Sequence, residues 1–497
     1  MSGTDSFKCS DLSRAEVRLV KLDPDKGYYG KQLWIPKKHV NPRSIKAGLE
    51  FPVMTDTGVE FKQLWEENDT HLIVPREFIP RSQYKDAPFP IISVGPTAYN
   101  KIKFKSKIVL DFLRPEEDVQ RRAHKAMSTV DGGILNLACG KGKSQIALQI
   151  IADSGVPAIV IVNNTTLINQ WRERIENFLE VEGGVGIVQG DPSKWDWKNR
   201  GIVLAMINTL AIRYDEIPEG FDQYFGGVYY DEVHHLSAPL FIHTAPMFYG
   251  ERYGLTATAN REDGLEPIYQ YHVGPVFFRD LAQDVKPRIY IQECPVTIDL
   301  RNPDVVNRVY DTRGKLNIPK LRTYLGTLPA NNQFIADKLQ LPVSKKRKIL
   351  ALSHSVDQLR ALHLMFPDSG LCTGEEKPAA RIETLKSKQI TFGTLQLVKE
   401  ALDEKTLDTI FFLTPFGSGA IEMGGKNTLQ QGMGRILGYR GGGNHPVVVI
   451  LDHIFIPKFH KMCRQLKKLI NDWPIDEGGP FEYTILRPFD ELERYKK

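Results

Sequence analysis

The sequence predicts an α/β protein in which two tandem parallel-sheet domains follow a small β-rich N-terminal domain. Two series of apolar segments alternate with helix-length segments, one starting near residue 111 and the other near residue 340. Strands that are apolar throughout are typical of a parallel sheet covered by helices on both faces. The first series reads "GILNL", "PAIVIV", "IVLAM", "GVYYD" and "RYGLT", and the second reads "KILALS", "SGLCTG", "QITFGT", "TIFFLT" and "PVVVILD".

The composition, 41% hydrophobic and 25% charged residues in a chain of 497, predicts a soluble globular protein. This length is enough for two to four domains, and no apolar run is long enough to span a membrane. The N-terminal segment "MSGTDSFKCSDLSR" lacks the apolar stretch of a secretory signal. Five scattered cysteines without metal-ligand spacing favour a reducing compartment, so we expect an intracellular, cytoplasmic protein.

Residues 1–110 read as short β segments separated by proline and glycine, such as "KQLWIP" and "THLIVP". The net charge of the chain is +5, and roughly all of this excess falls within these residues. Lysines alternate in "KIKFKSK", which favours a solvated strand edge over a strand that contacts phosphates. The aromatic residues of "GYYGKQLW" favour a core or a turn over a surface that stacks on bases.

Residues 137–144, "LACGKGKS", lie between the predicted strand "GILNL" and the predicted helix "SQIALQIIA". Backbone N–H groups of such a loop can wrap phosphate oxygens at a helix N-terminus, and the glycines on either side of Lys141 allow close approach. Lys143 can reach the β- and γ-phosphates of a nucleotide, and the Ser144 hydroxyl can hold Mg²⁺. The residues of this predicted cofactor-binding loop are Gly140, Lys141, Gly142, Lys143 and Ser144.

An acidic pair, Asp231 and Glu232, follows the apolar strand "GVYYD" about ninety residues after the loop. An aspartate at the carboxyl end of a strand can bind Mg²⁺ through water, and the adjacent glutamate can polarise an attacking water. An acidic pair that caps the next helix is the alternative, but it does not explain the spacing from the loop. Together the two elements predict an ATPase.

Four segments, "ACGKGKS", "DEVHH", "GLTATANRED" and "QQGMGRILGYR", occur in the order of the motifs of helicase superfamily 2. The chain resembles the branch of this superfamily that contains XPB and the viral UvsW-type branch-migration helicases. In that branch the loop has no glycine at the position of Leu137. The resemblance covers residues from about 110 to about 455. It implies two RecA-like domains with ATP and Mg²⁺ in the cleft between them.

The resemblance implies further roles in the first RecA-like domain. Gln120 lies upstream of the loop, where the family contacts adenine, although a glutamine on a helix surface explains it equally well. Asn163, Asn164 and Thr165 match the first strand-tracking motif and can donate to backbone phosphates, or they can form an ordinary N-cap. Thr209, in "MINTLA", is expected to contact a phosphate.

The segment "GLTAT" resembles the motif that couples hydrolysis to domain movement, through the hydroxyls of Thr256 and Thr258. Arg261, Glu262 and Asp263 follow directly. XPB-type helicases carry such a triplet at this position, and the resemblance implies a role in strand separation with Arg261 at the nucleic acid. Taken without the resemblance, the triplet is a solvated charge cluster.

The second domain carries fewer recognisable residues. "LSHSVDQL" resembles the motif that opens this domain, with Ser353 near nucleic acid. Thr394, in "FGTLQLVKEALD", is expected to touch the phosphate backbone, and Asp403 is expected near the nucleotide.

Gln431 and Arg435, in "QQGMGRILGYR", match the glutamine and the arginine finger of the family. An arginine finger stabilises charge on the transferred phosphoryl group. The family usually has a second arginine three residues later, where this chain has Gly438. Either Arg440 replaces it or one finger is absent.

From these patterns we expect an ATP- and Mg²⁺-dependent DNA helicase that tracks one strand of forks, Holliday junctions or R-loops. The alternatives are a translocase that displaces proteins or polymerase from DNA, and an ATP-gated binding module with low turnover. RNA or an RNA–DNA hybrid is a further possible substrate. The expected domains are 1–110, which would recognise the branch, 111–290 and 291–475, which are RecA-like, and 476–497, a tail packed on the second RecA-like domain.

Overall fold

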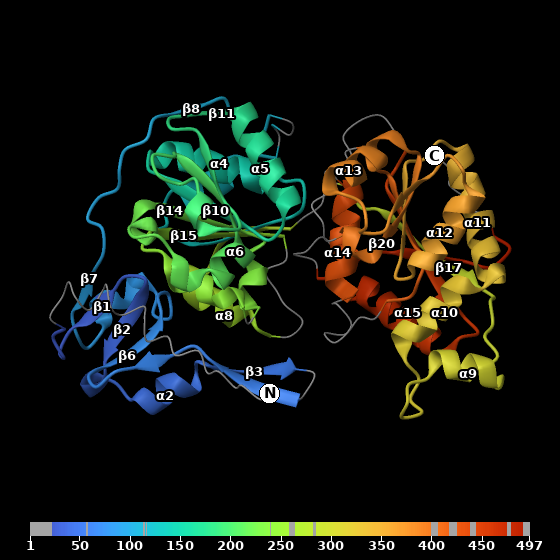
Figure 1. The fold of residues 1–497 in the computed structure, drawn as a ribbon, viewed down its shortest axis with the longest axis horizontal. Coiled ribbons are helices and arrows are strands. Elements are labelled where there is room, and N and C mark those ends of the chain that lie inside the picture. Colours follow the sequence, from blue (N-terminus) through green and yellow to red (C-terminus); the bar gives the residue numbers. More distant parts are fainter. Residues whose placement is uncertain are drawn as a thin grey trace. The chain divides into compact units, whose positions relative to one another are not determined.

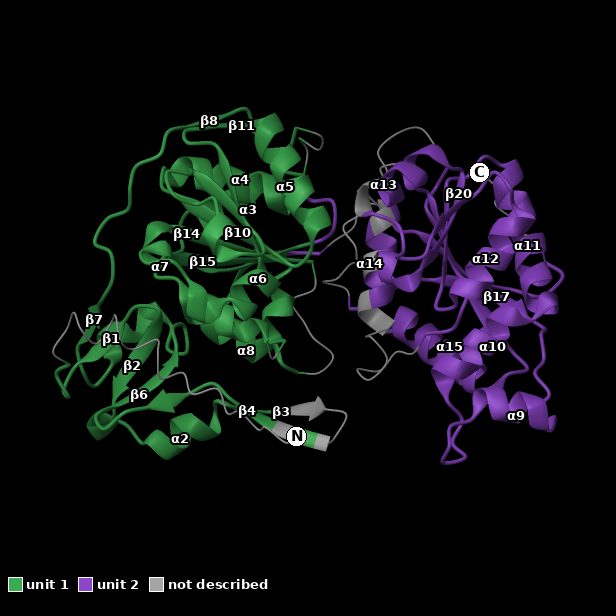
Figure 2. Cartoon of the chain, viewed as in Figure 1, with its two compact units in different colours: residues 1–137, 142–279 green, residues 138–141, 280–497 purple. Residues whose placement is uncertain are grey.

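The chain divides into two compact units, residues 1–137 with 142–279 and residues 138–141 with 280–497 (Figure 2). Each unit is built around one seven-stranded sheet. None of the helices described here is long and apolar enough to cross a membrane. The computed structural model describes residues 22–55, 58–112, 115, 117–238, 240–257, 264–281, 285–398, 406–416, 425–437, 444–474 and 479–490.

The first unit opens with a mixed five-stranded sheet in the order β5-β6-β2-β1-β7 and a separate β3–β4 hairpin (Figure 1). Leu33 and Ile35 of β2 are fully buried, as are Leu72 and Val74 of β6, so they form the core of this small domain. Its elements are β1 (Gly27–Tyr29), β2 (Gln32–Pro36), η1 (Lys37–His39), α2 (Pro42–Ala47), β3 (Glu50–Thr55), β4 (Gly58–Gln63), β5 (Glu66–Glu67), β6 (His71–Pro75), η2 (Arg81–Asp86) and β7 (Ile91–Ser93).

The larger sheet of the first unit has the order β12-β13-β10-β14-β15-β9-β16. The pairs from β12 to β9 are all parallel, as the apolar strands predict. In Figure 1, α4 and α5 lie on one side of this sheet and α6 and α8 on the other.

The strands and helices of this part follow the chain in a regular alternation. They are β8 (Phe104–Ser106), α3 (Val119–Met127), β9 (Gly133–Leu137), α4 (Lys143–Ser154), β10 (Ala158–Val162), α5 (Thr165–Phe178), β11 (Leu179–Val181), β12 (Val185–Val188), η3 (Pro192–Lys194), β13 (Ile202–Met206), α6 (Ile207–Ile212), η4 (Tyr214–Glu216), α7 (Phe221–Tyr224), β14 (Gly227–Asp231), η5 (Val233–Ser237), η6 (Phe241–Met247), β15 (Glu251–Thr256), α8 (Glu266–Val273) and β16 (Val276–Asp280).

The second unit repeats this architecture with a parallel sheet in the order β19-β20-β18-β21-β22-β17-β23. Its elements are β17 (Arg288–Cys294), α9 (Pro303–Val309), α10 (Ile318–Thr327), α11 (Pro329–Ser344), β18 (Ile349–Ser353), α12 (Val356–Met365), β19 (Gly370–Cys372), α13 (Pro378–Ser387), β20 (Ile390–Thr394), η7 (Leu395–Val398), β21 (Thr409–Phe412), α14 (Gly425–Leu437), β22 (Val447–His453), α15 (Pro457–Asn471) and β23 (Tyr483–Leu486). The fold class is therefore confirmed: two tandem RecA-like parallel sheets follow an N-terminal mixed β-sheet domain.

Two segments of uncertain role in the sequence belong to sheets. The lysine-rich segment contains β8, which pairs antiparallel with β11. The ammonium groups of Lys105 and Lys107 lie 3.3 and 3.2 Å from carboxylate oxygens of Glu180, so Glu180 offsets part of the positive charge of this edge. Near the C-terminus, β23 extends the second sheet by pairing parallel with β17.

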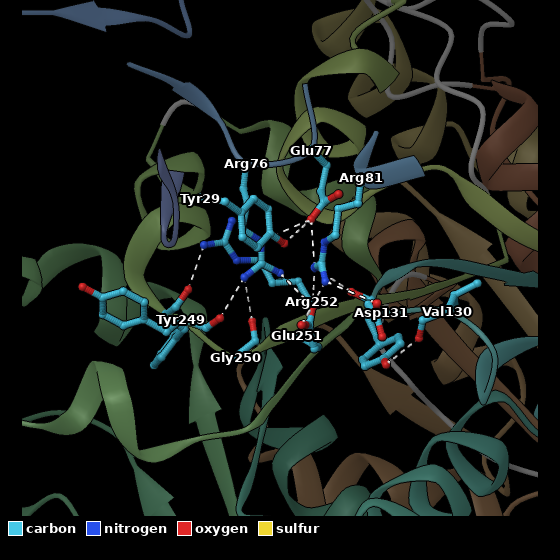
Figure 3. Close-up of polar contacts among 12 residues, drawn as sticks. Tyr29, Arg76, Glu77, Arg81, Val130, Asp131, Tyr249, Gly250, Glu251 and Arg252 are labelled. Carbon is cyan, nitrogen blue, oxygen red and sulfur yellow. Dashed lines mark hydrogen bonds and ion pairs between the residues drawn. The ribbon is translucent and has the colours of Figure 1, made fainter. Parts of the chain in front are cut away.

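The N-terminal sheet is fastened to the first RecA-like sheet by two buried arginines that point in opposite directions across the boundary (Figure 3). Arg76, directly after β6, donates to the backbone oxygens of Tyr249 and Gly250 at 2.9 and 3.0 Å. Arg252 of β15 donates to the backbone oxygen of Lys31 at 2.7 Å. Because each guanidinium meets backbone oxygens of the other domain, the two domains form one packed unit.

Charged side chains surround this pair of arginines. Arg81 donates through Nη1 to Glu251 Oε1 at 3.0 Å, and its Nη2 lies 3.1 Å from Glu77 Oε1. The Arg81 guanidinium also lies 4.6 Å from the centre of the Tyr29 ring, within the range of a cation–π contact. The carboxylates of Glu77 and Glu251 thus compensate much of the positive charge buried at this boundary.

We predict that Arg76→Met destabilises the first unit by about 3 kcal/mol, because it leaves buried carbonyl oxygens and carboxylates without their donor. Calorimetry of the full chain measures this as a lower unfolding temperature for one transition. Arg43→Met, which changes an exposed arginine of α2, is the matched control and should leave both transitions unchanged. Equal unfolding temperatures for Arg76→Met and the wild type would contradict the prediction that Arg76 stabilises the first unit.

Candidate nucleotide site and nucleic-acid contacts

The predicted phosphate loop connects β9 to α4, at the carboxyl edge of the first RecA-like sheet. Gly140 and Gly142 have φ angles of +78° and +82°, which non-glycine residues rarely adopt. A Cβ atom at Gly142 would also overlap the side-chain amide of Gln120. Leu137 is the last residue of β9 and is fully buried. Leu137 therefore packs as part of the sheet. The turn that requires glycine begins after Leu137.

The lysines of this loop have different partners. Lys143 starts α4, and its ammonium group donates to the backbone oxygen of Leu137 at 3.0 Å. The Lys143 ammonium group therefore folds back against the loop that precedes α4. Lys141 is buried, and its ammonium group lies 3.1 Å from Asp280 Oδ1. We infer that the Lys141 ammonium group is paired with Asp280. Only the backbone N–H of Lys141 is then available to bind a phosphate.

The acidic pair lies where β14 ends. Asp231 is half-buried, and its Oδ2 accepts a hydrogen bond of 2.8 Å from the indole nitrogen of Trp171. Burial and the neighbouring Glu232 carboxylate raise the pKa of Asp231 above its usual range. Glu232 has a φ of +51°, a strained conformation for a residue with a side chain.

Strand order places this pair close to the phosphate loop. One strand, β15, separates β14 from β9, so their carboxyl ends lie about 10 Å apart. That intervening strand ends at Thr256, whose hydroxyl lies 3.4 Å from Glu232 Oε2 and 3.2 Å from His234 Nδ1. The predicted coupling residue Thr256 therefore touches the predicted catalytic glutamate.

Sequence reasoning missed two residues of this site, Trp171 and Arg174 of α5. The Arg174 guanidinium donates to Ser144 Oγ at 2.9 Å, as Trp171 donates to Asp231. Their spacing of three residues is that of neighbours on one helix face. In the sequence it resembles ordinary core spacing, which is why no signal identified them.

The residues of the loop and the acidic pair fit a magnesium-bound nucleotide. A hydroxyl, Ser144, and a carboxylate, Asp231, are the hard oxygen ligands that Mg²⁺ prefers. The absence of a Cβ at Gly142 lets the Gln120 amide lie against the turn before α4. Gln120 lies directly beside that turn, as a residue that contacts the base of a bound nucleotide could.

The first strand-tracking motif lies at the N-terminus of α5. Asn164 Oδ1 accepts from the backbone N–H of Leu167 at 2.9 Å, so Asn164 is the N-cap of α5. Its amide nitrogen donates to Asn163 Oδ1 at 2.9 Å. Thr165 is exposed at the first helical position. Thr209 is half-buried, and its hydroxyl accepts from the backbone N–H of Gly190 at 3.2 Å. Contacts of these residues with nucleic acid stay predictions.

The candidates of the second unit lie at the ends of strands and on one helix. Ser353 ends β18 and is fully buried, with its hydroxyl 2.6 Å from Gln358 Oε1. It would reach a phosphate only if this contact opened. Thr394 ends β20 and is half-buried. Gln431 and Arg435 belong to α14, but their side chains lie outside the description. Four further candidates lie outside the described residues: Thr258, Arg261, Asp403 and Arg440.

Comparisons with known proteins show what the whole chain is similar to. A family model described as "Type III restriction enzyme, res subunit" matches residues 100–261. DNA 3'-5' translocase XPB2 of Sulfurisphaera tokodaii is 28% identical over 388 residues, covering 70% of this chain and 80% of that protein. The mimivirus protein "Putative ATP-dependent RNA helicase L396" is 27% identical over 366 residues, covering 71% of this chain and 66% of that protein, just under two thirds.

Solved structures match as well. Dbp5 of S. cerevisiae, bound to RNA and ADP BeF3, has a TM-score of 0.51 at 12% identity, over 76% of this chain and 92% of that one. At this identity the match establishes the fold alone. T4 UvsW is also a structural neighbour, with a TM-score of 0.36 over 93% of this chain and 99% of that one, a likeness too low to support an argument.

The paired RecA-like sheets, the phosphate loop and the acidic pair define an ATP-dependent helicase or translocase. The chain is related to XPB and to viral helicases of superfamily 2. The predicted family is thus confirmed.

We predict that Glu232→Gln leaves nucleotide binding within about twofold of the wild type and slows hydrolysis by a factor on the order of 10² to 10⁴, because the amide cannot accept a proton from water. Steady-state phosphate release and binding of a fluorescent nucleotide measure the two effects separately. Glu219→Gln, at an exposed position of the same unit, is the control. Normal turnover by Glu232→Gln would exclude this residue as the catalytic glutamate.

Proposed function

We propose that the chain is an ATP-driven DNA helicase or translocase that acts on branched DNA such as forks, Holliday junctions and R-loops, in replication, recombination or repair. One observation carries the ATPase part: Lys143, Asp231, Glu232 and Thr256 lie on one edge of one parallel sheet. The XPB relatives, which are named as DNA translocases and helicases, support the choice of DNA.

In this proposal the residues of the first unit hold ATP and prepare it for hydrolysis. The loop amides and Lys143 bind the phosphates, and Ser144 and Asp231 hold Mg²⁺. Bound Mg²⁺ would neutralise charge on the phosphate oxygens. Glu232 orients the attacking water and accepts its proton. Thr256 contacts Glu232, so a change in Glu232 during hydrolysis would alter this contact.

The preference for branches rests on the N-terminal domain. Arg76 and Arg252 hold this domain against the first RecA-like sheet, so a branch that it gripped would be fixed relative to β15. Most contacts of the motor would go to phosphates, which carry no sequence information and make binding sensitive to salt. RNA is the second candidate substrate, because the mimivirus relative is named as an RNA helicase.

We predict that forked or four-way DNA stimulates ATP hydrolysis about tenfold or more over plain duplex, at one fixed salt concentration. The measurement compares no nucleic acid, single-stranded, duplex, forked and four-way DNA, and matched RNA. Lys143→Ala, which removes the cation that reaches the phosphates, should abolish hydrolysis in every arm.

The other outcomes separate the alternatives. Equal stimulation by plain duplex would favour a translocase that displaces proteins, and stronger stimulation by RNA would favour an RNA substrate. Hydrolysis that no nucleic acid stimulates would favour the gated binding module.

We predict that Arg435→Ala leaves ATP binding largely intact and slows hydrolysis by a factor on the order of 10³, because an arginine finger acts on charge that develops in the transition state. The same binding and phosphate-release measurements test this. Arg464→Ala, at an exposed position on α15, is the control. If Arg435→Ala hydrolyses ATP at the wild-type rate, the finger lies elsewhere.

A further inference from the structure

Helix α5 contacts both of the residues that would hold Mg²⁺. Trp171 donates to Asp231 Oδ2 at 2.8 Å, and Arg174 donates to Ser144 Oγ at 2.9 Å. The two donors lie three residues apart, on one face of the helix. Ser144 is the second residue of α4 and Asp231 ends β14, so α5 connects these two elements through side-chain hydrogen bonds.

Trp171 is well suited to hold a carboxylate in one orientation. Its side chain is fully buried and is the largest such side chain in the described part of the chain. A buried indole has only one N–H to donate, and this one is directed at Asp231. One oxygen of the carboxylate is therefore fixed by the protein, which leaves the other as the natural metal ligand.

Arg174 places a positive charge at the same spot. The guanidinium donates to the Ser144 hydroxyl oxygen, so its charge lies at the first turn of α4. Lys143, which precedes Ser144, adds a second cation, and Glu232, which follows Asp231, adds an anion. Arg174 thus places a positive charge at the oxygen that would hold Mg²⁺.

We propose that Trp171 and Arg174 are positioning residues of the metal site, with Trp171 orienting Asp231 and Arg174 acting as a resident cation that Mg²⁺ must displace from Ser144. Two like charges next to one ligand oxygen repel, so Arg174 lowers the affinity of the site for Mg²⁺. This proposal rests on the proposed ATPase function.

Arg174 is tested by the Mg²⁺ dependence of ADP binding, which needs no hydrolysis and no nucleic acid. Arg174→Gln should reach half-maximal binding at about tenfold lower Mg²⁺ than the wild type, because the competing charge is gone. Arg174→Lys keeps the charge and should stay near the wild type. Arg172→Gln removes a charge from an exposed position of the same helix and is the control. An unchanged or higher Mg²⁺ requirement in Arg174→Gln would overturn the proposal.

Trp171 is tested by fluorescence. Adding Mg²⁺ to the ADP-bound wild type should change tryptophan emission, and Trp171→Phe should lose most of this change. Trp195→Phe is matched to it, because Trp195 is another buried tryptophan of the same unit, with its indole nitrogen 3.3 Å from the backbone oxygen of Gly190. If Trp171→Phe keeps the full change while Trp195→Phe loses it, Trp171 does not report on the metal site.

The two experiments separate this proposal from the proposed function. If the wild type binds ADP in a Mg²⁺-dependent way but no DNA stimulates hydrolysis, the DNA function fails and the positioning roles can stand. If DNA stimulates hydrolysis and Arg174→Gln requires as much Mg²⁺ as the wild type, the helicase function stands and the role of Arg174 fails.

Discussion

Parallel hydrogen bonding between β14, β15 and β9 is the constraint on which the candidate site depends. Parallel strands end on the same edge of a sheet, so each can deliver one functional segment to that edge. Here β9 leads into the phosphate loop, β14 ends in the acidic pair, and β15 ends in Thr256. Burial of all three strands keeps the register from slipping, because both faces are covered and any shift would misplace apolar side chains.

At that edge, one departure from ordinary backbone geometry marks the candidate site. Glu232 has a positive φ immediately after β14, which turns the chain away from the sheet and brings its carboxylate to Thr256. Backbone strain of this kind persists where the surroundings hold it in place. Helix α5 is one such support, since it begins at the Asn164 cap and contacts Asp231 about two turns later. The same helix thus connects the predicted strand-tracking residues with the proposed metal ligands.

The boundary between the N-terminal domain and the first RecA-like sheet depends on buried charged side chains. Arg76 and Arg252 are buried and are held by backbone oxygens, and Arg76 also lies close to the carboxylates of Glu77 and Glu251. Buried charge is costly to desolvate, and it is tolerated when its hydrogen bonds are made. The geometric demand of such bonds is strict, so they favour a single docking arrangement. Because Arg252 belongs to β15, this arrangement is tied to the strand that also carries Thr256.

The sequence by itself determined the fold class, and it predicted that a phosphate loop and an acidic pair follow two of the strands. These features depend on local chemistry: unbroken apolar strands, glycines at positive φ, and carboxylates directly after a strand. The sequence also indicated that Leu137 was not a defect, and its burial as the last residue of β9 explains why.

Tertiary structure alone decided which distant residues complete the site. Trp171 and Arg174 carry no motif, and only the packing of α5 against α4 and β14 directs them at Ser144 and Asp231. The same holds for the bonds of Arg76 to Gly250 and of Arg252 to Lys31, each of which joins residues more than 170 positions apart along the chain. Hydrogen-bond partners so far apart in sequence are set by the packing of whole elements, and no local pattern encodes them.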